Sequence, residues 1–247
     1  MEMIYGATTG PLDGDGVLAA YPWPDGGPWV RAMMVTALDG ASAGPDGLSG
    51  SISSPVDKVV FDAVRRLADV VLVGAGTVRA EGYGPMRARP ADAERRAADG
   101  QAAAPTLAIV SGSLDLPWGS ALFTESAQRP LVLTVADPPA EAAARAAEAR
   151  ADVVRAPGDE VAPAWVVETL VARGLRRVVC EGGPTLLESL VRAGLVDEAD
   201  ISLSPTFAGL GNVPHTDGLA EVAAFELRHV LHGDGFLMSR YVRSSTP

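Results

Sequence analysis

The peptide DVVLVG at residues 69–74 is an unbroken apolar run in which β-branched side chains dominate. Such a run is typical of a strand buried on both faces, and strands of that kind belong to parallel sheets that are covered on both sides. Comparable runs follow in PTLAIVSG, PLVLTVA and RRVVCEGG, and segments with helix signals lie between them. This alternation predicts an α/β fold with a mostly parallel central sheet flanked by helices.

The C-terminal part differs, because strand-like segments follow one another there without helices. These segments are residues 198–209, 223–235 and 235–243. The tetrapeptide HGDG joins the last two segments and is a hairpin signal. We therefore predict an antiparallel hairpin at one edge of the sheet, and we expect His229 and His232 beside it to lie at the surface rather than in a catalytic site.

Two segments are expected to lie outside the core. Residues 1–28 are rich in Gly, Pro and Asp, so we predict an N-terminal arm over the surface, anchored by Tyr21 and Trp23. A domain at residues 29–247 follows the arm. Within this domain, residues 84–104 are rich in Ala and Arg and are expected to form an exposed insertion.

The first helix of the domain is predicted from its starting residues. Ser54 is suited to the N-cap and Pro55 to the first helical position. An apolar stripe at helical spacing is expected to face the core, and its members are Val56, Val59, Val60 and Val64.

Charge and composition exclude several classes of function. The net charge of −11 argues against nucleic acid or an anionic membrane as a partner, because such partners require a basic surface. The single cysteine, Cys180, excludes an intrachain disulfide and a multi-cysteine zinc site, and we expect it to be an inert core residue. No metal site is predicted. No apolar run approaches the roughly 20 residues of a membrane span and no signal-peptide pattern begins the chain, so we expect a soluble, cytoplasmic protein.

Two glycine turns are the strongest candidates for a binding site. In parallel sheets, ligands bind beyond the carboxyl ends of the strands, where glycine lets the backbone approach them. One turn lies in VLVGAGTV, with Gly76 and Thr77, and the other lies in VVCEGGPTLL, with Gly182, Gly183 and Thr185. Unpaired N–H groups at each helix start favour phosphate, so the two turns could hold the two halves of a dinucleotide. Each turn could instead serve backbone geometry alone.

Four charged residues near these turns and the first helix each have two interpretations. Glu181 either accepts the N–H groups of the following helix or binds substrate hydroxyls. Glu81, at the end of the helix after the first turn, is either solvated or a proton donor. Arg65 and Arg66 either complement the C-terminus of their helix or pair with a substrate phosphate.

The motifs VTALDGAS, SISSP, VLVGAGTVRAEGYGP and CEGGPTLLESLVRAGLVDE together resemble the reductase domain of riboflavin biosynthesis. This is the RibD C-terminal family of the dihydrofolate-reductase-like superfamily, and the resemblance runs from about residue 28 to the end of the chain. It implies a dihydrofolate-reductase-like fold, NADPH as cofactor and a homodimer formed through the C-terminal strands. The Cys and His ligands of the zinc deaminase domain that often accompanies this family are missing, so a stand-alone reductase is expected.

The resemblance also assigns the cofactor-binding residues by matching position. The second glycine turn would receive the NADPH diphosphate, Ser53 would lie beside the nicotinamide, and Ser111 would lie near the adenosine ribose and its 2′-phosphate. The predicted cofactor-binding residues are Ser53, Gly76, Thr77, Ser111, Gly182, Gly183, Pro184, Thr185, Leu186 and Leu187.

For the substrate, the resemblance implies that Ser49 and Arg65 hold a phosphate and that Glu181 holds the sugar or base. Glu81 stands where the family usually has Asp, the acid proposed to protonate the substrate, and it is the predicted catalytic residue. Met33 stands where a Lys or Asn often reaches the substrate. Asp39, in LDG, matches a position that we expect to form a turn.

The implied activity is NADPH-dependent reduction of 5-amino-6-(5-phosphoribosylamino)uracil or a close analogue. One alternative is a reductase of dihydrofolate or another pterin, since Met33 would suit a flatter and less polar substrate. Another alternative is a regulator that binds NADPH without turnover.

Overall fold

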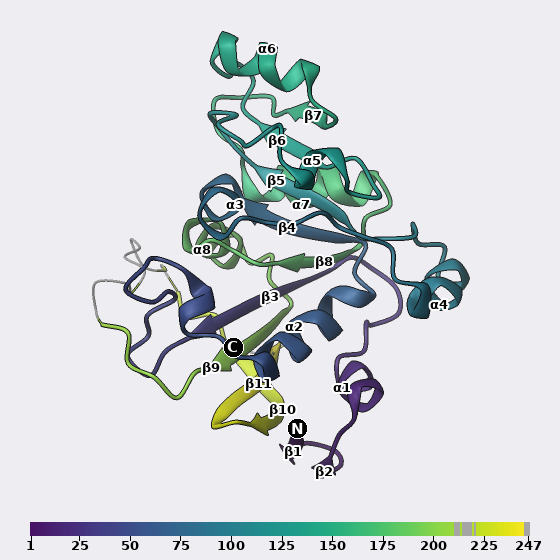
Figure 1. Ribbon diagram of the computed structural model, residues 1–247, viewed down its shortest axis with the longest axis vertical. Coiled ribbons are helices and arrows are strands. Elements are labelled where there is room, and N and C mark those ends of the chain that lie inside the picture. The colour runs from purple at the N-terminus through teal and green to yellow at the C-terminus, as the bar shows by residue number, and fades with distance from the viewer. Residues whose placement is uncertain (210–212, 214–218, 220, 245–247) are drawn as a thin grey trace. The chain divides into compact units, whose positions relative to one another are not determined.

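The computed structural model describes residues 1–209, 213, 219 and 221–244 (Figure 1). The chain divides into two compact units. Unit 1 comprises residues 1–65 and 196–247, and unit 2 comprises residues 66–195. The N-terminal arm expected at residues 1–28 is part of unit 1, and the expected boundary at residue 28 stays a prediction.

Unit 2 is built on parallel strands in the spatial order β8–β4–β5–β6–β7 (Figure 1). The strands are β4 (Val70–Gly74), β5 (Thr106–Val110), β6 (Leu131–Thr134), β7 (Asp152–Arg155) and β8 (Arg177–Cys180). Every neighbouring pair in this order is parallel, which confirms the predicted parallel sheet.

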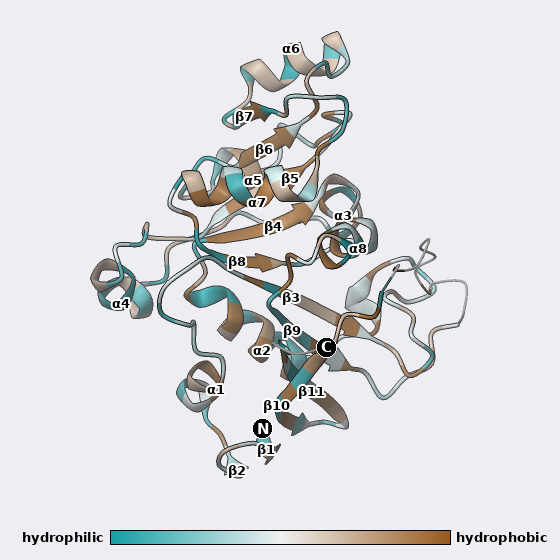
Figure 2. Ribbon diagram, turned by 180° about the vertical axis from the view of Figure 1, so that it is seen from behind, coloured by the Kyte–Doolittle hydropathy of each residue, from teal (hydrophilic) through white to brown (hydrophobic). Residues whose placement is uncertain are grey.

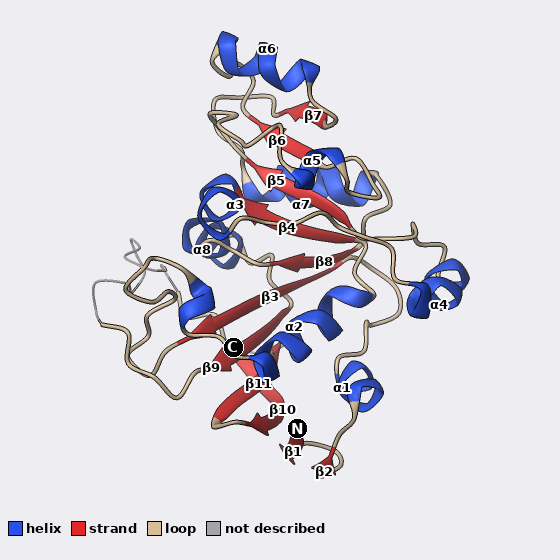
Figure 3. Ribbon diagram, viewed as in Figure 1, coloured by secondary structure: helices blue, strands red, loops and turns tan. Residues whose placement is uncertain are grey.

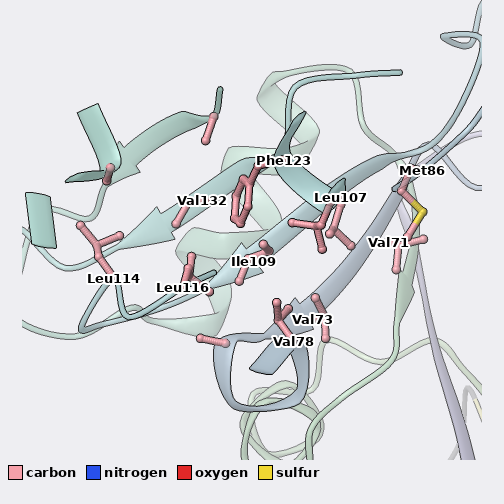
Figure 4. Close-up of a cluster of buried hydrophobic side chains, with 14 of the residues drawn as sticks. Val71, Val73, Val78, Met86, Leu107, Ile109, Leu114, Leu116, Phe123 and Val132 are labelled. Atoms are coloured by element: carbon pink, nitrogen blue, oxygen red, sulfur yellow. The ribbon is translucent and has the colours of Figure 1, made fainter. Parts of the chain in front are cut away.

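Strand β4 is covered on both faces. Its residues 70–73 are each 0% exposed, although successive side chains of a strand point to opposite faces. Figure 2 shows β4 and β8 in the brown of hydrophobic residues. One cluster of buried side chains includes Val71 and Val73 of β4, Leu107 and Ile109 of β5, and Phe123 (Figure 4). Burial of each large apolar side chain stabilises the fold by about 1.5–3 kcal/mol, so this interior is the main source of stability in unit 2.

The helices of unit 2 connect these strands. They are α3 (Ala75–Glu81), η2 (Pro90–Asp92), α4 (Ala93–Ala98), α5 (Ala121–Thr124), α6 (Ala140–Glu148), α7 (Pro163–Ala172) and α8 (Pro184–Arg192). Gly174 and Gly194 follow α7 and α8 with φ angles of +79° and +70°, the left-handed conformation that favours glycine at the end of a helix. Both helices therefore stop where the sequence predicts.

The expected exposed insertion at residues 84–104 is wrong at four side chains, because Met86, Asp92, Arg96 and Ala104 are buried. Asp92 and Arg96 are 3% and 2% exposed. Arg66 binds Asp92 through Nε and Nη2, with distances of 2.8 and 2.5 Å to Oδ1. Arg96 donates through Nη1 to the carbonyls of Arg66 and Ala68, at 2.9 and 3.0 Å. These contacts fasten the insertion to the first residues of unit 2, and composition alone does not reveal them.

Unit 1 contains strands in the order β2–β1–β10–β11–β9–β3. They are β1 (Glu2–Tyr5), β2 (Gly10–Pro11), β3 (Trp29–Thr36), β9 (Glu198–Leu203), β10 (Phe225–Gly233) and β11 (Phe236–Arg243). Only β3 and β9 pair in parallel in this part of the chain, and the other pairs in the described residues are antiparallel. Asp234 and Gly235, with φ of +50° and +81°, form the turn between β10 and β11, which confirms the predicted hairpin.

The N-terminal arm is more regular than predicted. It forms β1, β2 and the helix α1 (Gly14–Ala20), and β1 pairs with β10 instead of running over the surface. Tyr21 is 2% exposed, and the guanidinium of Arg31 lies 3.8 Å from the ring centre of Trp23. Arg31 also donates to the carbonyl oxygens of Tyr21 and Pro22. The two aromatic anchors are therefore confirmed, and Arg31 of β3 is the group that holds them.

Buried charges surround this anchor. Arg31 and Arg240 both contact Glu198 Oε1 at 2.8 Å, and Trp29 Nε1 donates to Glu198 Oε2 at 2.8 Å. Asp200, which is 1% exposed, follows Glu198 by two residues and lies on the same face of β9. Burial, reinforced by the nearby Glu198, raises the pKa of Asp200 well above its ordinary value. The carboxyl of Asp200 is therefore neutral at a pH where Glu198 is ionised.

Helix α2 (Pro55–Arg66) begins as predicted, with the Asp57 N–H donating to Ser54 Oγ at 3.3 Å. The predicted apolar stripe is wrong at Val59, which is 44% exposed. Asp57, at 2% exposure, lies on the buried side instead. The Ser53 hydroxyl donates to Asp57 Oδ2 at 2.6 Å, and this bond makes the burial of the carboxylate tolerable.

The expectation of two surface histidines is correct for His232 and wrong for His229, which is 4% exposed. His229 packs edge-on against Tyr21, with ring centres 4.8 Å apart. Burial, with the positive charge of Arg240 nearby, lowers the pKa of His229 from 6.5 to about 4.

The pH dependence of unfolding tests this burial. The unfolded chain protonates this imidazole as the pH falls through 6.5, whereas the folded chain resists until about 4. We expect the His229→Phe protein, which keeps a ring beside Tyr21, to lose about 3 kcal/mol less unfolding free energy than wild type between pH 7 and pH 4. Urea unfolding at several pH values measures this, with His232→Phe as the control. Equal pH slopes in wild type and His229→Phe would show that His229 titrates normally.

Candidate active site

The two glycine turns meet at one edge of unit 2 because β4 and β8 are neighbours. Leu72 of β4 stands opposite Cys180 of β8 in a parallel register, so the carboxyl ends of both strands lie together. The Glu181 N–H donates to the Leu72 carbonyl at 3.0 Å, and the Gly74 N–H donates to the Gly182 carbonyl at 2.7 Å. Helices α3 and α8 begin directly after these bonds and lie side by side (Figure 3).

Glycine is required where the turns approach each other. A Cβ added to Gly183 would lie 2.7 Å from Thr77 Oγ1, which is too close for real atoms. Gly182 has a φ of +82°, and its peptide bond to Gly183 is cis. By contrast, a Cβ on Gly76 would meet no atom within 4 Å, so open space lies above the start of α3. Gly183 thus serves the contact between the turns, and Gly76 leaves room for a ligand.

The start of α8 offers donors to an anion. Gly183 is the N-cap, Pro184 is the first helical residue, and the first helical bond joins the Leu187 N–H to the Gly183 carbonyl at 3.1 Å. The N–H groups of Thr185 and Leu186 precede that bond, and the first N–H groups of a helix have no partner within it. Pro184 and Thr185 are exposed, and Gly183, Leu186 and Leu187 are half-buried. The helix dipole adds partial positive charge, so this corner suits a diphosphate.

Glu181 has a partner that the sequence analysis did not identify. Its side chain is 6% exposed, and its Oε2 accepts a hydrogen bond of 2.7 Å from the Tyr83 hydroxyl. Tyr83 follows α3 within the peptide EGYGP, and 98 positions separate the two residues in the sequence. Only the pairing of β4 with β8 brings them together, so no local pattern predicts the contact.

The predicted acid, Glu81, is the last residue of α3 and is half-buried. Gly82 ends the helix in the left-handed conformation, with φ of +60° and ψ of +52°. The carboxylate therefore stands at the C-terminal end of α3, two residues before Tyr83.

Ser111, predicted to lie near the adenosine ribose, is 3% exposed. Its Oγ accepts a 3.0 Å hydrogen bond from the Leu114 N–H and so shapes the loop after β5. Its role at the cofactor stays a prediction.

The remaining predicted residues belong to unit 1. Ser49 is half-buried at the start of the short helix η1 (Ser49–Ser51), and Ser53 bonds to Asp57. The guanidinium of Arg65 lies 4.6 Å from the ring centre of Phe61. Arg66, the other candidate for a phosphate, is instead committed to Asp92 in unit 2. Arg66 therefore has a structural role, and the binding of a phosphate by Arg65 stays a prediction.

Asp39 forms the expected turn and does more. Its Oδ2 accepts from the N–H groups of Ala208 and Gly209 at 3.1 and 2.7 Å, and its Oδ1 accepts from the Ala41 N–H at 3.4 Å. These bonds, led by that from Gly209, lower the pKa of Asp39. Met33 is 2% exposed and presents almost no surface to a ligand.

Cys180 is 0% exposed, and burial raises the pKa of its thiol to about 12, as expected for an inert core residue. Among the described residues, no group of three or more His, Cys, Asp or Glu side chains is arranged to hold a metal ion. No helix in that part of the chain is both long enough and apolar enough to cross a membrane.

The chain is similar to riboflavin-pathway proteins over most of its length. A sequence model of the RibD C-terminal domain matches residues 28–235. A 2,5-diamino-6-ribosylamino-4(3H)-pyrimidinone 5′-phosphate reductase of Archaeoglobus fulgidus is 28% identical over 183 residues, which are 74% of this chain and 82% of that protein. The riboflavin biosynthesis protein RibD of Mycobacterium tuberculosis is 32% identical over 182 residues, which are 74% of this chain and 43% of that protein.

A solved structure agrees with these relatives. The crystal structure of a pyrimidine reductase-like protein from Corynebacterium diphtheriae has a TM-score of 0.78 and 25% identity, covering 88% of this chain and 92% of that one. The α/β fold with a mostly parallel sheet and a C-terminal antiparallel hairpin is thereby confirmed.

The contact between the two turns makes a testable prediction. Gly183→Ala forces a methyl group against Thr77, and we expect the free energy of unfolding to fall by about 1–3 kcal/mol. Adding Thr77→Ala removes the obstructing Oγ1 and should restore much of that loss. Gly76→Ala is the matched control, because its methyl group enters open space and should cost nothing. Denaturant unfolding measures all four proteins, and a Gly183→Ala protein as stable as wild type would contradict the contact.

Proposed function

Because the chain belongs to the RibD C-terminal domain family, we propose that it is an NADPH-dependent reductase of 5-amino-6-(5-phosphoribosylamino)uracil or a close analogue. The observation that carries the proposal is the match to a pyrimidine reductase over 82% of that protein, joined with the glycine corner at β4 and β8. Neither observation alone identifies the substrate. Together they favour a riboflavin-pathway reductase over a reductase of unrelated substrates.

The glycine corner fits a dinucleotide. Gly76 leaves open space at one helix start, and α8 presents exposed N–H donors at the other. In our proposal the residues from Gly182 to Leu187 hold the diphosphate, and Gly76 and Thr77 contact the same molecule. Ser53 and Ser111 complete the cofactor site at the nicotinamide and at the 2′-phosphate. Bound NADPH supplies the hydride.

The substrate side of the proposal rests on Arg65, Ser49 and Glu181. A guanidinium binds phosphate through paired N–H donors, and a serine hydroxyl adds one more. Arg66 pairs with Asp92, and in our proposal Arg65 takes this task because it matches the phosphate-binding position of the family. Glu181, as an acceptor, suits the sugar hydroxyls or the amino groups of the pyrimidine.

The chemistry requires one hydride and one proton. The hydride adds to C1′ of the ribosylamino group and reduces it, so that the ring-opened ribityl product forms. The electron pair of the C1′–O bond goes to the ring oxygen, and Glu81 delivers a proton to that oxygen. Positioning and this proton transfer are the protein's contributions.

We also propose a homodimer through the C-terminal strands. Leu237 of β11 and Ile4 and Tyr5 of β1 are 37%, 47% and 53% exposed, so apolar surface is available at both strands. Sedimentation of the purified protein tests the oligomeric state.

The central experiment mixes the purified protein with NADPH and the pyrimidine ribosyl phosphate and follows the loss of NADPH absorbance. We expect saturable turnover with NADPH, weaker turnover with NADH and none with dihydrofolate. Turnover of dihydrofolate alone would favour the pterin alternative, and NADPH binding without any turnover would favour a regulator.

The acid is tested by Glu81→Gln. The amide keeps the size of the side chain but cannot donate the required proton, so we expect kcat to fall by about 10²–10⁴-fold. The NADPH dissociation constant should stay within about twofold of wild type. Glu94→Gln, at an exposed position of α4, is the control for charge removal. An unchanged kcat in Glu81→Gln would exclude Glu81 as the acid.

A further inference from the structure

We propose that Tyr83 is a positioning residue that orients the Glu181 carboxylate for substrate recognition. The inference rests on the proposed function and deepens it, because it adds a residue to the substrate side of the site. It starts from the 2.7 Å hydrogen bond between the Tyr83 hydroxyl and Glu181 Oε2.

Tyr83 is held firmly from both sides. Gly82 precedes it in the left-handed conformation that ends α3. Met86 follows it, is 9% exposed, and is fixed by a 3.0 Å bond from its N–H to Ser126 Oγ and a 2.8 Å bond from the Ala127 N–H to its carbonyl. The ring of Tyr83 packs against the core cluster that contains Val78 and Met86. The packing of the ring and the hydrogen bonds of Met86 therefore restrict the position of the Tyr83 hydroxyl.

The bond has a directional effect on Glu181. A carboxylate that is 6% exposed is stable only when donors satisfy it, and an O–H donor to an ionised oxygen forms one of the stronger hydrogen bonds. Holding Oε2 restricts the rotation of the carboxylate, and this narrows the directions from which ligand donors can approach it. An oriented acceptor selects ligands that carry hydroxyl or amino groups, such as a sugar or a pyrimidine.

The same geometry argues against Tyr83 as an acid. Its proton is already donated to Glu181, so it is not available to a substrate. The role of Tyr83 is exerted through Glu181, and proton delivery stays with Glu81.

The test is Tyr83→Phe, which keeps the ring on the core and removes only the hydroxyl. We expect the KM for the pyrimidine ribosyl phosphate to rise about 10-fold, because substrate binding must then order the carboxylate. The NADPH dissociation constant and kcat should stay within about twofold of wild type. In a Glu181→Ala background the same substitution should change KM by less than about twofold, because the acceptor of the Tyr83 hydrogen bond is gone. Tyr5→Phe, at an exposed site of β1, is the control.

Each outcome decides the matter. A Tyr83→Phe protein with wild-type KM and turnover overturns the inference and leaves the proposed function standing. A parallel fall in NADPH affinity and kcat shows a general structural role and also overturns it. A wild-type protein that neither binds nor reduces the pyrimidine overturns the proposed function, and this inference with it.

Discussion

The parallel pairing of β4 with β8 is the constraint on which unit 2 depends. Two strands that are remote in the sequence end at the same edge, and the bond from the Gly74 N–H to the Gly182 carbonyl joins their turns. This pairing places Gly183 against Thr77 and brings the starts of α3 and α8 together. It also brings Glu181 within hydrogen-bond distance of Tyr83, which follows α3. Groups that a sheet holds in place in this way are preorganised, and a ligand that binds them has a smaller ordering cost.

Unit 1 follows a different physical rule, because its interior contains charge. Glu198 forms ion pairs with Arg31 and Arg240 and accepts a hydrogen bond from Trp29. Such a network gives little net stability compared with apolar packing, but breaking it leaves a buried charge. The network has a specific structural role, because Arg31 of β3 donates to two carbonyl oxygens of the N-terminal arm. An apolar side chain could not form these hydrogen bonds.

The parts of the fold that could be predicted from the sequence are those governed by local chemistry. The β-branched run of β4, Ser54 before α2 and the Asp234–Gly235 turn each carry their own structural preference. The features that were missed depend on partners far along the chain. The residues around Tyr83 in the sequence do not predict its hydrogen bond to Glu181, and those around His229 do not predict its burial against Tyr21. At the candidate site the glycine turns could be predicted because their signals are local. The hydrogen bond between Tyr83 and Glu181 could not, because it joins residues far apart in the sequence.

The depth at which Cys180 lies has a practical consequence for studying this chain. It is the only cysteine, its thiol is shielded on all sides, and at neutral pH almost none of it is thiolate. Maleimide dyes and spin labels should therefore find no native target. A cysteine introduced at any exposed position would become the sole attachment point, so fluorescence and spin-probe distances can be recorded without first removing a natural thiol.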